Sequence, residues 1–132
     1  MSTIHIGGFR RLCGQIPIQG SKNGVLPMMA ASVLSRDTTV LTNVPAIQDV
    51  FCMMGILKFM GCRCTLAGGE LTISPADMNR TDLPEEQVRR MRSSIVLLGA
   101  MLGRFGEAST SYPGGCSIGK RPIDFHLNAL RA

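Results

Sequence analysis

Apolar and polar positions along the 132-residue chain alternate in short blocks, which predict strands and helices in turn. Over the first part of the chain, alternating or β-branched blocks predict five strands, at residues 3–6, 15–19, 38–44, 63–66 and 70–73. Blocks with helical periodicity predict two helices between them, at about residues 20–34 and 47–60. Ser21 is the expected N-cap of the first helix, and Gly61 closes the second. The last two strands are expected to form a hairpin.

The pattern then starts again. Pro84 and the two acidic residues after it predict the start of a long helix that runs to about Arg104 and is broken or thinned at Gly99 and Gly103. The next predicted elements are a strand and a helix, at residues 107–112 and 123–130. The spacing between the two series is about 70 residues, which indicates a weak internal repeat of a β-α-β-α-β-β unit. The second unit stops inside a predicted helix, so we expect a fragment of a longer protein.

The composition is that of a globular protein with the length of one domain, with 45% hydrophobic and 17% charged residues. Aromatic residues are scarce, so we expect an aliphatic core rich in methionine. The net charge of +5 comes from scattered basic pairs with acidic residues nearby, and no aromatic residues are interleaved with them. This pattern favours small anionic substrates over nucleic acid as partners.

Cysteine usage and apolar runs indicate the compartment. The chain has five cysteines, no C-x-x-C pair and no signal peptide at its N-terminus, which predicts a reduced, cytoplasmic protein. The longest apolar run, at residues 95–102, is too short to cross a bilayer, so no membrane segment is expected. No spacing of cysteines with His5 or His126 supports a metal site, and the cysteines other than Cys116 are expected to be inert thiols.

Cys116 lies in a segment that favours chemical reactivity. It follows Pro113-Gly114-Gly115 and precedes Gly119 and the cations Lys120 and Arg121. Positive charge nearby lowers the pKa of a thiol, and glycines let a ligand approach the backbone closely. A lone cysteine in a turn is more often an ordinary structural residue. The glycines and adjacent cations favour the functional interpretation here.

Four further polar residues are candidates for ligand binding. Lys22 and Asn23 follow a helix start, where backbone N–H groups and the helix dipole favour an anion, although a solvated lysine beside a cap fits equally well. Arg92 precedes an apolar run and, taken alone, is more typical of a solvated helix residue. Asp124 could accept a hydrogen bond from a ligand, but helix capping is its commoner role.

Taken together, these residues resemble one family of enolpyruvyl transferases, the UDP-N-acetylglucosamine 1-carboxyvinyltransferases. The resemblance rests on three segments that occur in order over essentially the whole chain, Gly20-Ser21-Lys22-Asn23 with Leu26-Pro27, Met91-Arg92-Ser93-Ser94-Ile95, and Pro113 to His126. The string Gly-Gly-Cys-x-Ile-Gly-x-Arg-Pro-x-Asp-x-His is its most specific part. Ser-Lys-Asn alone would be a weak signal.

The resemblance implies transfer of the enolpyruvyl group of phosphoenolpyruvate to the 3-hydroxyl of UDP-N-acetylglucosamine, the first committed step of bacterial peptidoglycan synthesis, without a metal or organic cofactor. It implies that Cys116 donates a proton to the methylene carbon of phosphoenolpyruvate and that Lys22 and Arg121 neutralise its phosphate and carboxylate. Asn23 would help to position the sugar. The groups that would hold the nucleotide sugar are Arg92, Arg121, Pro122, Ile123, Asp124 and Phe125.

The implied fold is the inside-out α/β barrel of the enolpyruvyl transferases, an α/β (α+β) fold built from β-α-β-α-β-β units, of which this chain would hold about one and a half. Residues 1–21 would be strands that pair with the second domain, and residues 22–132 an incomplete first domain. Family members are roughly three times longer, so we expect the isolated chain to be inactive and a missing C-terminal segment to be its partner. Two alternatives are a 5-enolpyruvylshikimate-3-phosphate synthase-like transferase and a non-catalytic nucleotide-sugar-binding fragment.

Overall fold

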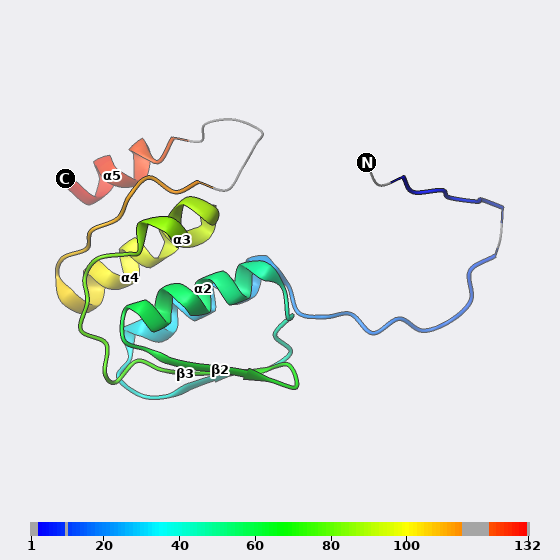
Figure 1. Ribbon diagram of the computed structural model, residues 1–132, viewed down its shortest axis with the longest axis horizontal. Coiled ribbons are helices and arrows are strands. Elements are labelled where there is room, and N and C mark those ends of the chain that lie inside the picture. The colour runs from blue at the N-terminus through cyan, green and yellow to red at the C-terminus, as the bar shows by residue number, and fades with distance from the viewer. Residues whose placement is uncertain (1–2, 10, 115–121, 132) are drawn as a thin grey trace.

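The computed structural model describes residues 3–9, 11–114 and 122–131. Within these residues, a three-stranded antiparallel sheet carries helices on one of its faces (Figure 1). In chain order the elements are α1 (Lys22–Ala31), η1 (Ser32–Leu34), β1 (Thr39–Leu41), α2 (Gln48–Phe59), β2 (Arg63–Ala67), β3 (Glu70–Ser74), α3 (Glu85–Arg90), η2 (Arg92–Ile95), α4 (Val96–Phe105) and α5 (Asp124–Arg131). The predicted mixture of helix and sheet is confirmed.

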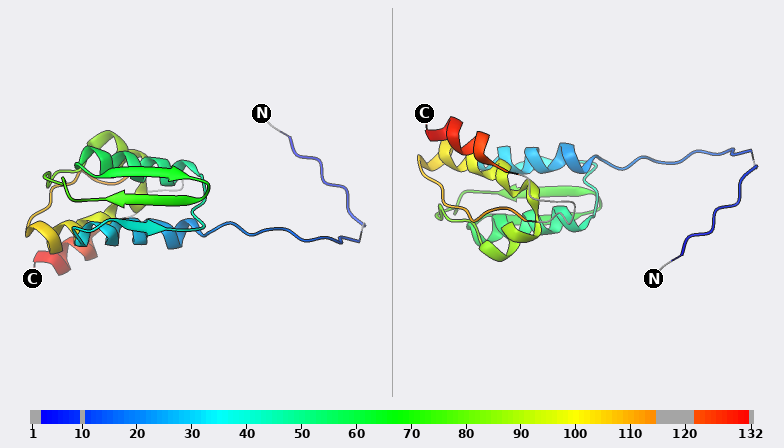
Figure 2. Two further views of the ribbon diagram at one scale, coloured as in Figure 1. Left: turned by 90° about the horizontal axis from the view of Figure 1, so that it is seen from below. Right: turned by 90° about the horizontal axis from the view of Figure 1, so that it is seen from above.

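The helices form two layers over the sheet. α1 and α2 lie side by side and cover one sheet face, as the two views of Figure 2 show. α4 packs on α1 and η1, and α3 packs on α2, so that these two helices form the outer layer. α5 lies farthest from the sheet and has no buried side chain in its range. None of the described elements covers the opposite face of the sheet (Figure 2).

The sheet has the strand order β1-β3-β2, because the hairpin β2–β3 turns back to pair with β1. Gly68 and Gly69 form the hairpin turn, and both have positive φ, at +57° and +79°. In β3 the side chains of Leu71 and Ile73 are fully buried and face the helices, whereas Glu70 is exposed. This alternation is the period of two that the sequence showed. The predicted hairpin and both of its strands are confirmed.

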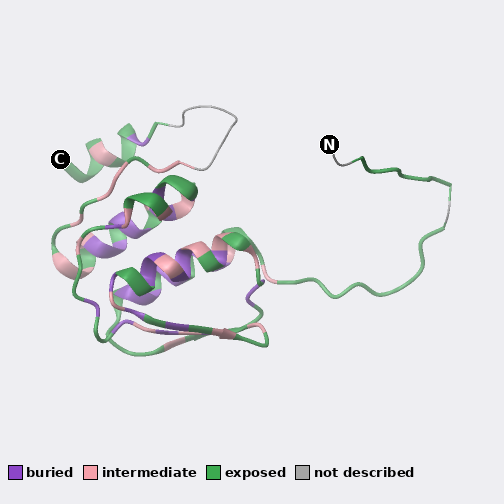
Figure 3. Cartoon of the chain, in the orientation of Figure 1, coloured by how far each residue is buried: buried purple, intermediate pink, exposed green. Residues whose placement is uncertain are grey.

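The buried residues, purple in Figure 3, lie on the sheet and on the helices above it, and their hydrophobic side chains form one core cluster. The predicted richness in methionine is confirmed, because seven methionines are buried, Met29, Met53, Met54, Met60, Met78, Met91 and Met101. Methionine is unbranched and flexible, so it fills the irregular spaces where three layers meet. None of the helices in the described part of the chain is long and apolar enough to span a membrane.

The long helix predicted from Pro84 to Arg104 is interrupted, but at a different place from the one expected. The prediction of breaks at Gly99 and Gly103 is wrong, since both lie inside α4. The interruption is at Met91, whose backbone is extended (φ −136°, ψ 112°). Met91 is buried, and its carbonyl accepts bonds from the N–H of Ser94 at 3.2 Å and from the Ser94 hydroxyl at 2.7 Å, so a new turn starts there.

Gly103 has a packing role instead. A Cβ at this position would lie 3.2 Å from Cδ2 of Leu34, so the glycine lets α4 approach the end of η1 closely. Gly106 ends α4 with a left-handed φ of 75°, and its N–H donates to the carbonyl of Leu102 at 2.9 Å.

The predicted strand at 107–112 is wrong, whereas the strands at 3–6 and 15–19, which we expect to pair with a second domain, stay predictions. The segment 107–112 forms only an isolated parallel bridge between Ser109 and Asp82. Residues 3–6 and 15–19 lie in an exposed N-terminal arm that points away from the body of the molecule (Figure 1). The arm alternates as strands do, and its apolar side chains Ile4, Ile6, Ile16 and Ile18 are 83–89% exposed. Alternation alone therefore did not produce a strand, because a strand also needs a neighbour that accepts its backbone hydrogen bonds.

Candidate functional site

Lys22 is the first residue of α1 and forms an ion pair with Asp49 of α2. Its Nζ lies 2.7 Å from Oδ2 of Asp49, and the two side chains are 51% and 34% exposed. The backbone of Ser21 is extended, and its carbonyl accepts from the N–H groups of Gly24 and Val25, so Ser21 is the N-cap residue that was predicted. Its side chain makes no capping hydrogen bond, however. The N–H groups of the first turn therefore have no side-chain cap from Ser21.

Asp49 is a site residue that the sequence did not reveal. It lies in the first turn of α2, where an acidic residue is commonly explained by the helix dipole alone. Only the packing of α1 beside α2 brings it to Lys22. Asn23 follows Lys22 in α1 and is exposed. The start of α1 thus presents an amide and a cation whose direction is fixed by a neighbouring carboxylate.

Arg92 is exposed at the start of η2, immediately after the interruption at Met91. The sequence placed it within a continuous helix, whereas the structure places it at the beginning of a new turn. Its position is set by backbone hydrogen bonds, since the N–H of Met91 donates to the carbonyl of Val88 at 3.3 Å. Among the described residues, Arg92 takes part in no ion pair with an acidic side chain.

The same carbonyl of Val88 holds the chain that leads to the cysteine segment. The N–H of Gly114 donates to it at 3.2 Å, and a Cβ on Gly114 would lie 1.9 Å from the carbonyl oxygen of Arg89. Farther back, Ser109 exchanges backbone hydrogen bonds of 2.8 and 2.9 Å with Thr81 and Leu83. The chain from Ser109 to Gly114 is therefore attached at its start to the segment before α3 and at its end to α3 itself. Arg92 and Gly114 consequently leave from the same end of α3.

Cys116 and Arg121 lie outside the described residues. After this gap, Ile123 is buried, and Pro122, Asp124 and Phe125 are exposed. Asp124 is the first residue of α5, and the side chain of Phe125 is 88% exposed. The predicted helix at 123–130 is confirmed. The structure thus describes seven of the predicted site residues, all at or beside helix starts, and their roles stay predictions.

The other thiols are less acidic than an ordinary cysteine where they are buried. Desolvation raises the pKa of Cys62 to about 12 and that of Cys64 to about 11, from an ordinary value of 9.0. Both side chains belong to the hydrophobic core. Burial also raises the pKa of Cys52, and the carboxylate of Asp49 adds to the effect. Cys13 is exposed in the N-terminal arm.

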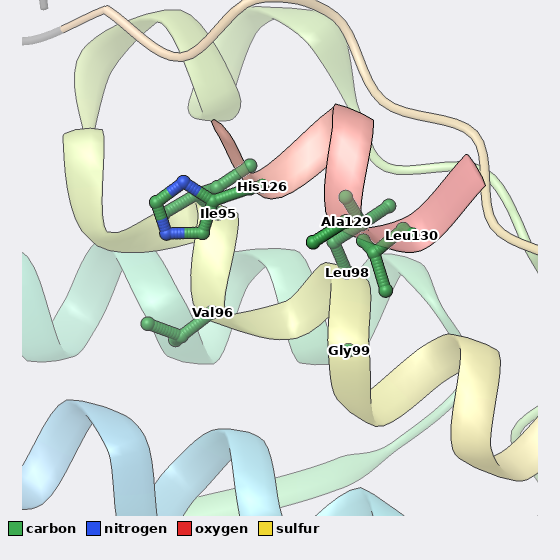
Figure 4. A pocket seen from close by; sticks show the side chains of 7 residues that line it. All are labelled: Ile95, Val96, Leu98, Gly99, His126, Ala129 and Leu130. Atoms are coloured by element: carbon green, nitrogen blue, oxygen red, sulfur yellow. The ribbon is translucent and has the colours of Figure 1, made fainter. Parts of the chain in front are cut away.

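A hollow of about 320 Å³ lies between α4 and α5. Figure 4 shows its walls, with Ile95, Val96, Leu98 and Gly99 on one side and His126, Ala129 and Leu130 on the other. The lining is largely apolar, and it is not formed by the candidate site residues. In the part of the chain that the structure describes, histidine, cysteine and acidic side chains nowhere gather in a group that could hold a metal ion.

A family model described as EPSP synthase (3-phosphoshikimate 1-carboxyvinyltransferase) matches residues 6–132. Proteins named UDP-N-acetylglucosamine 1-carboxyvinyltransferase resemble the chain over nearly its whole length. Those of Dichelobacter nodosus and Pseudothermotoga lettingae are 42% and 44% identical to it, over 100% and 99% of the chain. The alignments cover 32% and 31% of these relatives, so the chain spans about a third of their length.

A solved structure also resembles this fold. The enolpyruvyl transferase NikO from Streptomyces tendae superposes with a TM-score of 0.67 at 26% identity. The match covers 73% of this chain and 22% of that one. The sheet with its helices is therefore a part of a known architecture, and the expectation of a partial barrel fold is confirmed.

Proposed function

The chain belongs to the EPSP synthase family, and from this premise we propose that it forms part of an enzyme that transfers the enolpyruvyl group of phosphoenolpyruvate to the 3-hydroxyl of UDP-N-acetylglucosamine. Phosphate is the second product. The reaction breaks the carbon–oxygen bond to phosphate and forms a new ether to the sugar. Such a transfer commits the sugar nucleotide to peptidoglycan synthesis, and we place it in the cytoplasm.

The observation that carries the proposal is the 40–44% identity to proteins named for this reaction, over 99–100% of the chain. The alignments span the segments that contain Lys22, Arg92 and Cys116, because they cover nearly the whole chain. Because the chain spans about a third of these relatives, the activity belongs to a longer assembly in which this chain contributes one wall.

We assign the chemical roles on the basis of charge and position. Cys116 would deliver the proton to the methylene carbon of phosphoenolpyruvate, because the neighbouring cations Lys120 and Arg121 favour release of a thiol proton. Lys22 and Arg121 would neutralise the phosphate and the carboxylate. Fixed cations stabilise charge that develops in a transition state at little cost in reorganisation. The ion pair with Asp49 supports this role for Lys22, because it holds the ammonium group at the start of α1.

The acceptor sugar would be held by groups that precede and follow Cys116 in the sequence. Asn23 is exposed at the start of α1 and would position the sugar, and Arg92 would contact its diphosphate. Residues 121–125 would complete the contact with the nucleotide. Phe125 supports this assignment, because an aromatic side chain that is 88% exposed is available to stack on a base. No metal or organic cofactor has a part in the proposed reaction.

Alkylation by fosfomycin tests the assignment of Cys116. The thiolate opens the epoxide, a carbon–sulfur bond replaces a carbon–oxygen bond, and the oxygen takes up a proton. Peptide mass spectrometry should find the adduct on Cys116, with little on the exposed Cys13 of the same molecule. A Cys116→Ser variant should remain unmodified. Equal labelling of the two thiols, or none on Cys116 in a folded chain, would favour a non-catalytic sugar-nucleotide-binding fragment.

The acceptor is tested by competition. UDP-N-acetylglucosamine should change the rate at which fosfomycin labels Cys116 at millimolar concentration, and shikimate 3-phosphate should not. A change in the labelling rate caused by shikimate 3-phosphate, but not by UDP-N-acetylglucosamine, would instead support an acceptor like that of 5-enolpyruvylshikimate-3-phosphate synthase.

A further inference from the structure

Gly20 makes the closest backbone approach in the vicinity of Lys22. A Cβ at Gly20 would lie 2.0 Å from the carbonyl oxygen of Asn43 and 3.2 Å from its carbonyl carbon. It would also lie 3.5 Å from Cδ of Pro45. The nearest obstacle is backbone, which cannot rotate aside as a side chain can. Any residue other than glycine at position 20 would therefore push the two segments apart.

The turn at Asn43, which Gly20 contacts, is itself held by hydrogen bonds. Asn43 has a left-handed φ of 55°, a conformation that asparagine tolerates better than most residues. The next N–H, that of Val44, donates to the carbonyl of Gly69 in the hairpin turn at 2.8 Å. Pro45 is buried, and its carbonyl accepts from the N–H of Ile47 at 2.9 Å, just before α2 begins. The carbonyl of Asn43 is thus tied both to the sheet and to the start of α2.

Two contacts consequently join the starts of α1 and α2. Gly20 lies two residues before Lys22, and the turn at Asn43 lies six residues before Asp49. The glycine contact fixes the backbones, and the ion pair of 2.7 Å joins the side chains. The lysine is half exposed, and within the described structure Asp49 is the acidic residue that pairs with its ammonium group.

We infer that Gly20 is a positioning residue, which by packing on the carbonyl of Asn43 holds Lys22 in its ion pair with Asp49. Its consequence for the reaction rests on the proposed function, in which Lys22 meets the phosphate of phosphoenolpyruvate. Gly20 itself touches no substrate. It sets the distance between the starts of α1 and α2. That distance determines whether the Lys22 ammonium group reaches the Asp49 carboxylate.

The test compares Gly20→Ala with Gly24→Ala in the full 132-residue chain. A Cβ on Gly24 would meet its nearest atom, Cβ of Ser21, at an ordinary 3.7 Å, so this variant is the matched control within α1. Both proteins are treated with a trace of acetic anhydride, and peptide mass spectrometry gives the acetylation of Lys22 relative to the exposed Lys58. The ratio should rise about twofold to fivefold in Gly20→Ala, as it should in Asp49→Asn, because loss of an exposed ion pair releases the amine to the reagent.

A second pair of variants approaches the same contact from its other side. Asn43→Val places a β-branched residue in a left-handed conformation and should shift the carbonyl, with the same rise in the Lys22 ratio. Asn43→Gly keeps the turn and should leave the ratio unchanged. A folded Gly20→Ala or Asn43→Val protein, with its circular dichroism intact and a Lys22 ratio equal to that of Gly24→Ala, would overturn the inference.

The acetylation ratio is measured without substrate, so it tests the positioning alone. Protection of Lys22 from acetylation by 1 to 10 mM phosphoenolpyruvate, roughly the range of weak ligands, tests the proposed function separately. Protection in Gly24→Ala that is lost in Gly20→Ala would support both. A raised ratio without protection in any variant would reject the function of Lys22 while the positioning by Gly20 stands.

Discussion

At the scale of the single residue, surroundings decide what each polar or reactive side chain does. Cys62 and Cys64 are thiols by sequence, but burial makes them members of the core. Arg104 resembles a surface cation in the sequence, but in the structure it links segments of backbone. Its guanidinium donates to the carbonyls of Val33 at 2.7 Å, Ser35 at 2.6 Å and Pro75 at 2.9 Å. Two measurements follow from these environments.

The buried thiols should make the protein less stable at high pH. Their folded pKa values, about 12 and 11, lie above the ordinary value of 9.0 that applies when the chain is unfolded. The unfolded state therefore loses protons first, so their contribution is complete below pH 9 and is lost progressively as the pH rises toward 11 and 12. Urea titrations at pH 8 and pH 10 should show a lower midpoint at pH 10. A Cys62→Ala, Cys64→Ala protein should lose much of this difference, and an unchanged difference would contradict the assignment.

Arg104 should be important for stability through its hydrogen bonds. Arg104→Ala leaves three carbonyls of the η1 and β3 ends without their donor, and we expect a loss of about 2–3 kcal/mol in the free energy of unfolding. Arg63→Ala is the matched control, because its ion pair with Asp77 is well exposed and should contribute less than about 1 kcal/mol. Urea unfolding of both variants compares the two values. Equal losses would show that Arg104 is not a structural link.

At the scale of the element, the sequence predicted what local signals determine. α1, α2 and the hairpin were found because their caps, turn glycines and periodicity agree with one another. The extended residue Met91 was missed because no glycine or proline marks it, and its conformation depends on burial and on the bonds of Ser94. The strand at 107–112 was overpredicted, since only Ser109 finds a neighbouring backbone.

The candidate site residues also fall into two groups, those that the sequence identified and those that only the packing identified. Lys22, Asn23 and Arg92 were identified from motifs, whereas Asp49 required the packing of two helices. Gly114 belongs to the second kind too. Its glycine character looked like freedom for a ligand to approach, and the structure gives it a close contact with the end of α3. The sequence alone cannot distinguish these two uses of glycine, because both require the same residue.

The attachment of Gly114 to α3 should be measurable. Gly114→Ala would place a Cβ 1.9 Å from the carbonyl oxygen of Arg89, so the segment must leave α3 and the bond to Val88 must break. We expect a loss of about 1–3 kcal/mol in unfolding free energy and faster hydrogen exchange at Met91, which shares that carbonyl.

Gly99→Ala serves as the control for this variant. It lies in α4 with open space around its Cβ position, and it should gain up to about 1 kcal/mol from helix propensity. Unchanged exchange at Met91 in a folded Gly114→Ala protein would contradict the proposed attachment.

At the scale of the whole molecule, the chain corresponds to only part of the enolpyruvyl transferases that it resembles. The alignments cover 31–32% of the length of relatives named for the complete reaction and 22% of the length of the solved NikO structure. Its candidate groups lie at the starts of α1 and η2 and around the described edge of the cysteine segment. A reaction between two anionic substrates needs groups on every side of them.

We therefore expect the purified 132-residue chain to release no phosphate from phosphoenolpyruvate and UDP-N-acetylglucosamine above the level of a Cys116→Ser variant. A malachite green assay measures this release. Its control is a relative of full length, such as that of Dichelobacter nodosus, assayed at the same concentration. Turnover by the chain within about tenfold of that relative would show that these residues suffice.

The exposed N-terminal arm has a practical consequence for handling the protein. Its exposed apolar side chains, at Ile4, Ile6, Ile16 and Ile18, alternate as in a strand and present an open template for a strand from another molecule. Pairing of arms between copies is a second-order process, so turbidity and light scattering should increase steeply as samples are concentrated. Dilute storage, or a lysine in place of one of these isoleucines, is the corresponding remedy, and structural work at millimolar concentration should begin from such a variant.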